Sequence, residues 1–262
     1  MAAYDWITLT TDYGLSDGYA GMLRGVIAQH APWARVIDVT HLVPPGDVAR
    51  GATVLAQAVG HFPPAVHVGV VDPGVGTGRR AVAIRTPRGL LVGPDNGLLT
   101  AAADALGGVQ AAVRLTETTW FLPEVSMTFH GRDVFAPVAA RLAAGVPLAD
   151  AGPAIEPESL VRLPEPIVVI GDGYLEAEVL TVDRFGNVQL AAPGPAIDGL
   201  GEQLMVGGVR ATRAKTFADG QPGRLIVYVD SAGKVALAVN GGRAVVALAV
   251  SPGDVLRIAS RA

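Results

Sequence analysis

The sequence contains no cysteine, and this absence excludes several kinds of site. Disulfide bonds, thiolate-bound metals and cysteine nucleophiles are therefore all impossible. The lack of cysteine is also compatible with a reducing compartment. No uninterrupted apolar run is long enough to span a bilayer. The start, MAAYDWITLTTDYG, lacks a basic segment followed by a long apolar one, which disfavours a signal peptide. We therefore expect a cytoplasmic protein with no membrane partner.

Blocks of positive charge are also missing. The chain has 20 Lys and Arg against 24 Asp and Glu, which gives a net charge of -4. Because nucleic-acid backbones are bound through clustered basic residues, we expect no nucleic-acid partner. The five histidines show no HxxxH or HExxH spacing, so we also expect no metal site.

What the chain does have is a large apolar content, since half of its 262 residues are hydrophobic. In the first half, short apolar runs alternate with helix-like stretches, which predicts an α/β domain with a mostly parallel sheet. The predicted strands are 6–11, 34–42, 65–72 and two strands within 81–97. The predicted helices are 17–31, 47–62 with an Asp cap, 97–108 and 133–145.

The texture changes where prolines accumulate, at Pro153, Pro157, Pro164 and Pro166. Beyond them the chain reads as short strands punctuated by Gly, Asp-Ser and Pro-Gly, which predicts a smaller all-β domain, a barrel or a sandwich. We therefore predict an α/β domain over 1–155, a Pro-rich linker over 156–166 and a β domain over 167–262.

A glycine-rich stretch, VVDPGVGTGRRAV at 70–82, resembles a phosphate-binding loop. It lacks the Lys-Ser/Thr of a Walker loop, and its glycines have neither the Rossmann spacing nor a helix after them. Pro and Gly are also ordinary turn residues, so a structural turn is the competing interpretation. Asp72 ends an apolar strand and Arg79 follows across the turn, which would allow an ion pair.

Two further stretches carry candidate polar groups. In TTDYGLSDGYAG, Asp12 directly follows the first strand, and a carboxylate in this position would accept hydrogen bonds from both hydroxyls of a ribose. Asp17 precedes the first helix, and either Ser16 or Asp17 would serve equally well as its N-cap. In MTFHGRDVFAPVA, His130 enters a helix and is a candidate acid or base.

Two turns of the β domain, in VDRFGNVQL (182–190) and VDSAGKVALAVNGGRA (229–244), read locally as hairpin turns. Taken with the earlier stretches, however, they complete a pattern. The motifs TLTTDYGLSDGYAGMLRGVI, IDVTH, VVDPGVGTGRRAV, GPDNGLLT, TFHGRDVFAP, VDRFGNV and DSAGKVALAVNGG occur in one order over nearly the whole chain. In this the sequence resembles the S-adenosylmethionine (SAM) hydroxide adenosyltransferases, relatives of the halogenases that attack SAM at C5′.

The resemblance implies an α/β domain, a β domain and a homotrimer with active sites at subunit interfaces. It implies that SAM is the substrate and that no cofactor is needed. Asp12 matches the ribose ligand, and Asp17, Asp183 and Ser231 match positions around the methionine amino and carboxylate groups. Asn187 and the backbone near Val239, Asn240 and Gly241 match adenine contacts, while Phe185 walls the pocket. The catalytic set is then Asp72, Arg79 and His130.

The implied reaction converts SAM and water into adenosine and L-methionine. The halogenase branch has a Tyr at the position of Asp72 and lacks the Arg and the His, which favours water over chloride. The sequence leaves two alternatives open, a SAM-dependent halogenase and a non-catalytic sensor of SAM or adenosine. A methyltransferase is disfavoured, because TTDYG stands where the usual glycine-rich loop should follow the first strand.

Overall fold

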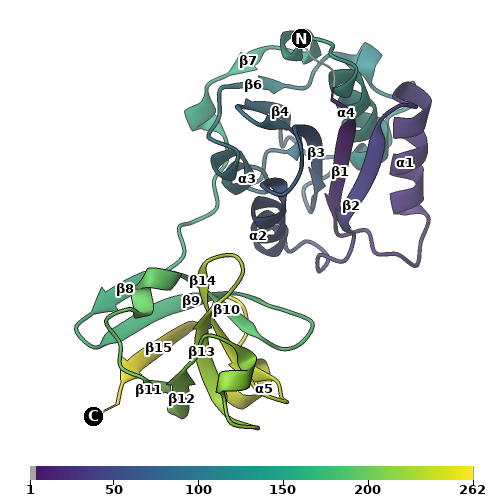
Figure 1. Ribbon diagram of the computed structural model, residues 1–262. Helices are drawn as coiled ribbons and strands as arrows, with labels where there is room; N and C mark the ends of the chain where they lie inside the picture. Colours follow the sequence, from purple (N-terminus) through teal and green to yellow (C-terminus); the bar gives the residue numbers. More distant parts are fainter. Residues whose placement is uncertain (1–3, 262) are drawn as a thin grey trace. The chain divides into compact units, whose positions relative to one another are not determined.

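The computed structural model describes residues 4–261, which form two compact units that divide between Leu163 and Pro164 (Figure 1). The first unit is an α/β layer structure and the second is a closed β-barrel. The predicted fold class is confirmed. Of the two architectures that the sequence left open for the second unit, the structure has the barrel and not the sandwich.

The first unit is built on a seven-stranded mixed sheet in the order β2-β1-β3-β5-β4-β6-β7. The neighbours β2, β1, β3 and β5 pair in parallel, and the remaining pairs are antiparallel. Its strands are β1 (Trp6–Thr11), β2 (Arg35–Thr40), β3 (Ala65–Val70), β4 (Ala81–Thr86), β5 (Gly89–Pro94), β6 (Ala111–Arg114) and β7 (Ala154–Ile155).

Helices cover both faces of this sheet. One face packs against α1 (Tyr19–His30) and α4 (Ala136–Ala143), and the other packs against α2 (Val48–Val59) and α3 (Thr100–Ala105). Because both faces are covered, β3 and β5 are buried along their whole lengths, which explains why their sequences are apolar apart from His67. The predicted cap of α2 is confirmed, since the Asp47 carboxylate accepts a hydrogen bond from Arg50 N at 2.9 Å.

Three helix predictions need correction. The N-cap of α1 is Gly18, with no side-chain hydrogen bond, so neither Ser16 nor Asp17 caps it. The helix expected at 97–108 is confined to Thr100–Ala105, because Leu106 ends it and two glycines in the left-handed region follow. The helix expected at 133–145 begins earlier, with a π-helical segment over Gly131–Phe135 that leads into α4. Such π-helical turns often occur at functional sites.

Residues 156–163 pack on the first unit. Leu160 is buried, Val161 N donates to Asp95 Oδ1 at 2.9 Å, and the Arg80 guanidinium bonds both Asp95 and Ser159. Short 3₁₀ helices over Thr118–Trp120, Leu148–Ala151 and Pro157–Ser159 complete the first unit.

In the second unit, seven strands close into a barrel in the order β10-β14-β13-β12-β11-β15-β9, and β9 pairs back to β10. The strand β8 adds to the outside of β9. The strands are β8 (Val168–Gly171), β9 (Tyr174–Val182), β10 (Val188–Pro193), β11 (Gln203–Val206), β12 (Val209–Arg213), β13 (Leu225–Val229), β14 (Lys234–Val239) and β15 (Val255–Ser260). The helical segments are Gly194–Ile197, Phe217–Asp219 and α5 (Ala244–Leu248).

Strand β9 shows the alternation expected of a barrel wall with one face inward. Its residues alternate strictly between half-buried and buried, and the buried side chains include Leu175, Ala177 and Val179.

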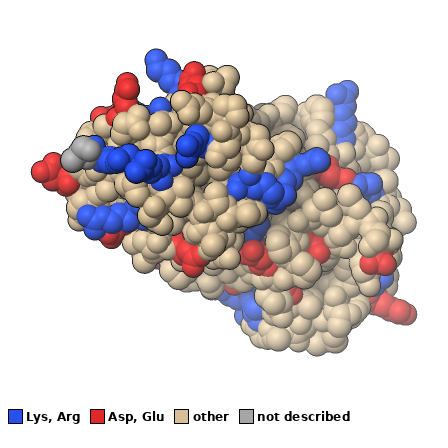
Figure 2. Space-filling view, turned by 90° about the horizontal axis from the view of Figure 1, so that it is seen from below, with Lys and Arg blue, Asp and Glu red and all other residues tan. Residues whose placement is uncertain are grey.

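The surface charge is mixed: over the face shown in Figure 2, basic and acidic side chains are interspersed. Within residues 4–261, no helix is both long and apolar enough to cross a membrane.

A buried histidine in the sheet leads to a prediction about acid stability. His67 on β3 is fully buried, and its Nδ1 lies 2.8 Å from the Thr8 hydroxyl. Burial lowers the His67 pKa from 6.5 to about 4, so the fold binds the neutral ring. Stability is therefore complete above the unfolded-state pKa and is lost as pH falls from about 6.5 to 4, by about 3 kcal/mol.

The measurement is the free energy of unfolding against pH for the native chain and for His67→Gln, which retains a hydrogen-bonding group but does not titrate. We expect the variant to lose about 3 kcal/mol less than the native chain between pH 7 and pH 4. Equal losses of unfolding free energy in the two proteins would show that His67 does not determine the loss of stability at low pH.

Candidate active site

The candidate site of the first unit lies at the carboxyl edge of the parallel strands. β1 and β3 are neighbours in the sheet, with Thr11 opposite Val70. Asp12 follows β1 directly, and Asp72 follows β3 with only Val71 between them. Both carboxylates therefore emerge at the same edge of the sheet. Open α/β sheets bind their ligands at this edge.

The glycine-rich stretch after β3 folds as a tight turn. Val75 N donates to Asp72 O at 3.1 Å, and the Thr77 hydroxyl donates to Gly74 O at 2.7 Å. Gly76 has φ +75°, and a Cβ there would overlap the carbonyl oxygen of Met127. Glycine is therefore required both for the turn and for its close approach to the loop that carries the candidate histidine.

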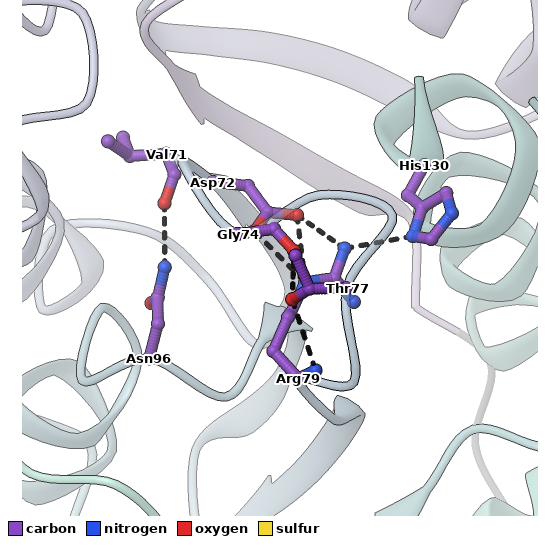
Figure 3. Close-up of polar contacts among 7 residues, drawn as sticks. All are labelled: Val71, Asp72, Gly74, Thr77, Arg79, Asn96 and His130. Atoms are coloured by element: carbon purple, nitrogen blue, oxygen red, sulfur yellow. Dashed lines mark hydrogen bonds and ion pairs between the residues drawn. The ribbon is translucent and has the colours of Figure 1, made fainter. Parts of the chain in front are cut away.

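The turn returns Arg79 to Asp72, as the sequence predicted, and Figure 3 shows His130 joining them. Arg79 Nε donates to Asp72 Oδ1 at 2.9 Å, and an ion pair joins Arg79 NH2 to Oδ2. The same NH2 group lies 2.9 Å from His130 Nδ1. Arg79 thus contacts both other members of the predicted set, one seven residues away in sequence and the other 51.

The geometry fixes the protonation pattern of His130. A guanidinium only donates hydrogen bonds, so His130 Nδ1 accepts and the neutral ring carries its proton on Nε2. Partial burial lowers the His130 pKa, and the positive charge of Arg79 lowers it further. The ring is therefore neutral near pH 7 and presents an N–H donor at Nε2.

Two supporting residues were not assigned to the site from the sequence. Asn96 Nδ2 donates to Val71 O at 2.8 Å, which fixes the backbone immediately before Asp72 (Figure 3). Asp133 is fully buried and accepts from Ser126 N at 2.8 Å and Arg132 Nε at 2.6 Å. Its bonds hold the loop that leads to His130. The placement of Asn96 directly after a strand, in GPDNGLLT, was the available signal.

The two remaining candidates of the first unit differ in how firmly they are held. Asp12 Oδ2 accepts a hydrogen bond from Gly46 N at 2.9 Å, which orients the carboxylate. Asp17 is exposed in the loop before α1, and its side chain has no hydrogen-bond partner among residues 4–261. A cap role for Asp17 is wrong, so its carboxylate remains available to a ligand.

In the second unit, a turn at one end of the barrel gathers three candidates. Asp183 Oδ1 accepts from the backbone N of both Phe185 and Asn187, at 2.8 and 2.9 Å, and Oδ2 accepts from Asn187 Nδ2 at 2.8 Å. The carboxylate thus organises the turn, and the Phe185 ring is left 66% exposed at its tip. The Arg184 guanidinium lies over this ring, 5.4 Å from its centroid.

The other candidates of this unit lie on both sides of β14. Val239 ends the strand and is followed by Asn240 and Gly241, beside the 183–187 turn, since β10 and β14 are antiparallel neighbours. Asn240 Nδ2 donates to Gly220 O at 2.7 Å. Ser231 lies in the turn before the start of β14, so the structure places it at the opposite end of that strand from Gly241.

The described residues, 4–261, include no group of three His, Asp or Glu side chains suited to holding a metal. What the Asp72–Arg79–His130 cluster offers instead is an oriented cation next to an N–H donor and a carboxylate. Groups of this kind bind and stabilise a small anion or a polarised water.

This geometry predicts how His130 titrates. In the native chain, an NMR titration of the ring should give a pKa below 6.5, because burial and Arg79 both disfavour the charged form. Arg79→Ala should move the value upward, since one of the two causes is removed. Arg80→Ala is the matched control and should leave it in place, because Arg80 bonds Asp95 and Ser159. An unchanged pKa in Arg79→Ala would contradict the contact.

Comparison with known proteins identifies the family of the chain. The family model for the SAM hydroxide adenosyltransferase N-terminal domain matches residues 7–152, and the model for the C-terminal domain matches residues 177–257. An (R)-S-adenosyl-L-methionine hydrolase from Salinispora arenicola is 64% identical over 258 residues, which cover 98% of this chain and 99% of that protein.

A solved structure and a second curated protein are also similar to the chain. A crystal structure from Thermotoga maritima, described as an uncharacterized conserved protein, superposes with a TM-score of 0.90 at 38% identity, covering 97% of this chain and 100% of that one. A fluorinase from Actinoplanes sp. is 29% identical, covering 89% of this chain and 90% of its own length. Both domain models and the full-length relative lead to one conclusion: the chain belongs to the SAM hydroxide adenosyltransferase family.

Proposed function

We propose that the chain hydrolyses S-adenosyl-L-methionine to adenosine and L-methionine. The observation that carries the proposal is the double contact of Arg79, which bonds the Asp72 carboxylate and His130 Nδ1 within one cluster. Membership of the family and the likeness to a named SAM hydrolase support it.

The chemistry is an in-line substitution. A water oxygen attacks C5′ of SAM, the C5′–O bond forms, and the C5′–S bond breaks with its electron pair passing to the sulfonium sulfur. The leaving group is neutral methionine, so no acid is needed to protonate it. The site must hold the water in line with the C5′–S bond and accept one of its protons.

The cluster supplies these needs with separate groups. The guanidinium of Arg79 stabilises negative charge that develops on the water oxygen, and His130 Nε2–H donates to the same oxygen. His130 Nδ1 is already occupied by Arg79, so the ring is not free to take the proton at that nitrogen. The tautomer therefore favours Asp72, whose oxygens have remaining lone pairs, as the acceptor of the water proton.

The remaining candidates would bind the substrate. Asp12, oriented by Gly46 N, would accept both ribose hydroxyls, and the exposed Phe185 ring would wall the adenosyl pocket. The methionine amino and carboxylate groups would lie near Asp17, Asp183 and Ser231. The adenine contacts would come from Asn187 and the backbone over Val239, Asn240 and Gly241.

The proposal includes a homotrimer in which each site combines the first unit of one subunit with barrel turns of the next. The support is that the turn at 183–187 carries candidate ligands for SAM, whereas the proposed catalytic residues Asp72, Arg79 and His130 all lie in the first unit. No cofactor is required, since SAM itself carries the sulfonium leaving group. We place the enzyme in the cytoplasm, with which the absence of cysteine is compatible.

Incubation with SAM, followed by chromatography, should yield adenosine and methionine. Arg79→Ala should lower kcat by roughly 100-fold or more, because it removes the cation of the cluster, while SAM still binds. Arg80→Ala is the matched control at the adjacent position, and it should lower the thermal stability but retain most of the turnover.

Other outcomes separate the alternatives. Formation of 5′-chloro-5′-deoxyadenosine in chloride would replace hydrolysis by halogenation, a reading kept open by the fluorinase relative. Tight SAM binding without turnover by the native chain would establish the sensor.

Subunit complementation tests the shared site. Asp72→Ala damages only the first unit and Asp183→Ala only the barrel turn, so each variant alone should be inactive. When the two are co-assembled at random in equal amounts, roughly a quarter of the interfacial sites contain both intact halves. We expect about that fraction of native activity to return. If each site were built within one chain, no activity above the sum of the two variants would appear.

A further inference from the structure

Tyr13 lies beside the candidate site and has no role in the reaction as described so far. It follows Asp12 directly, and its ring packs edge-on against Phe129, with centroids 5.5 Å apart. Tyr19 contacts both rings, at 6.0 Å from Tyr13 and 5.2 Å from Phe129. Three aromatic rings in mutual contact hold the Tyr13 side chain in one orientation.

The hydroxyl end of this ring lies over Gly131, the residue after His130. A Cβ added at Gly131 would overlap the Tyr13 hydroxyl and would come within 3.1 Å of Cζ and 3.2 Å of Cε2. Gly131 is not among the residues with positive φ, so its backbone conformation does not demand glycine. The missing side chain serves to admit the Tyr13 hydroxyl next to His130.

This hydroxyl has no hydrogen-bond partner among residues 4–261, although most of the side chain is buried. A tyrosine in such a position usually bonds something at its hydroxyl. Its surroundings include the active cluster, because Tyr13 directly follows Asp12 and its hydroxyl lies against Gly131, the residue after His130. Burial and the carboxylates of Asp12 and Asp72 raise the Tyr13 pKa far above 10, so the hydroxyl remains protonated in the working range of pH.

We propose that the Tyr13 hydroxyl is a fourth catalytic group, which hydrogen-bonds the attacking water and fixes its position. The proposal rests on the proposed hydrolysis. In the step, the water oxygen bonds to C5′, the C5′–S electron pair moves to sulfur, and one water proton passes to Asp72. Tyr13 keeps its own proton throughout, so it directs the water without acting as a base.

The first test is Tyr13→Phe, which removes one oxygen and keeps the packing against Tyr19 and Phe129. We expect kcat to fall by roughly 10- to 100-fold, as for a lost bond to a group that gains charge in the transition state. KM for SAM and the melting temperature should stay close to native values. Tyr4→Phe is the matched control, because Tyr4 precedes β1 in the same unit whereas Tyr13 follows it, and it should keep native kcat.

A native kcat in Tyr13→Phe would overturn the proposal. If the native chain itself forms no adenosine, the proposed function fails, and this outcome is separate from a failure of Tyr13 alone.

A double-mutant cycle with Gly131→Ala keeps the proposal testable if Tyr13→Phe is destabilised. In the native background the new methyl group displaces the hydroxyl, so Gly131→Ala should lower kcat to a similar extent as Tyr13→Phe. In the Tyr13→Phe background the overlap with the hydroxyl is gone and only the closer ring contacts at 3.1 and 3.2 Å remain, so the further loss should be less than threefold. Losses that multiply fully would show that Gly131 and Tyr13 act independently, which contradicts the proposal.

Discussion

The ion pair between Asp72 and Arg79 is the interaction on which the proposed chemistry depends. It closes the turn after β3, and the terminal nitrogen that pairs with Asp72 also donates to His130. Both side chains are largely buried, at 6% and 12% exposure, so the pair is weakly screened by solvent. A carboxylate that holds a cation in a fixed orientation would provide electrostatic preorganisation for the proposed reaction.

Arg79 and Arg80 are adjacent in the sequence, but Arg79 belongs to the proposed catalytic cluster whereas Arg80 has a structural role. Arg79 leaves the turn toward the cluster, whereas Arg80, at the start of β4, points the other way to Asp95 and Ser159. Successive residues of an extended chain face opposite sides, so a GRR sequence supplies one arginine to each. The second arginine ties the segment around Ser159 to the sheet of the first unit, which ends at Leu163.

Glycine has two different tasks around the site. At Gly76 the left-handed backbone and the approach to Met127 O both require it. At Gly131 the backbone is ordinary, and the requirement is space for an aromatic hydroxyl. The first task is recognisable as turn chemistry in a sequence. The second is visible only when the residue above the glycine is known.

The sequence alone determined the layer architecture, the β-rich second unit and the turn that returns Arg79 to Asp72, and its resemblance to a family supplied the residues that we propose as the catalytic set. These follow from local periodicity, from turn residues and from motif order. Tertiary structure decided the tautomer of His130, the support from Asn96 and Asp133, the failure of Ser16 or Asp17 to cap α1, and the position of Tyr13. Each of these depends on contacts between segments far apart in sequence, such as Arg79 with His130 or Tyr13 with Gly131, and no local pattern encodes them.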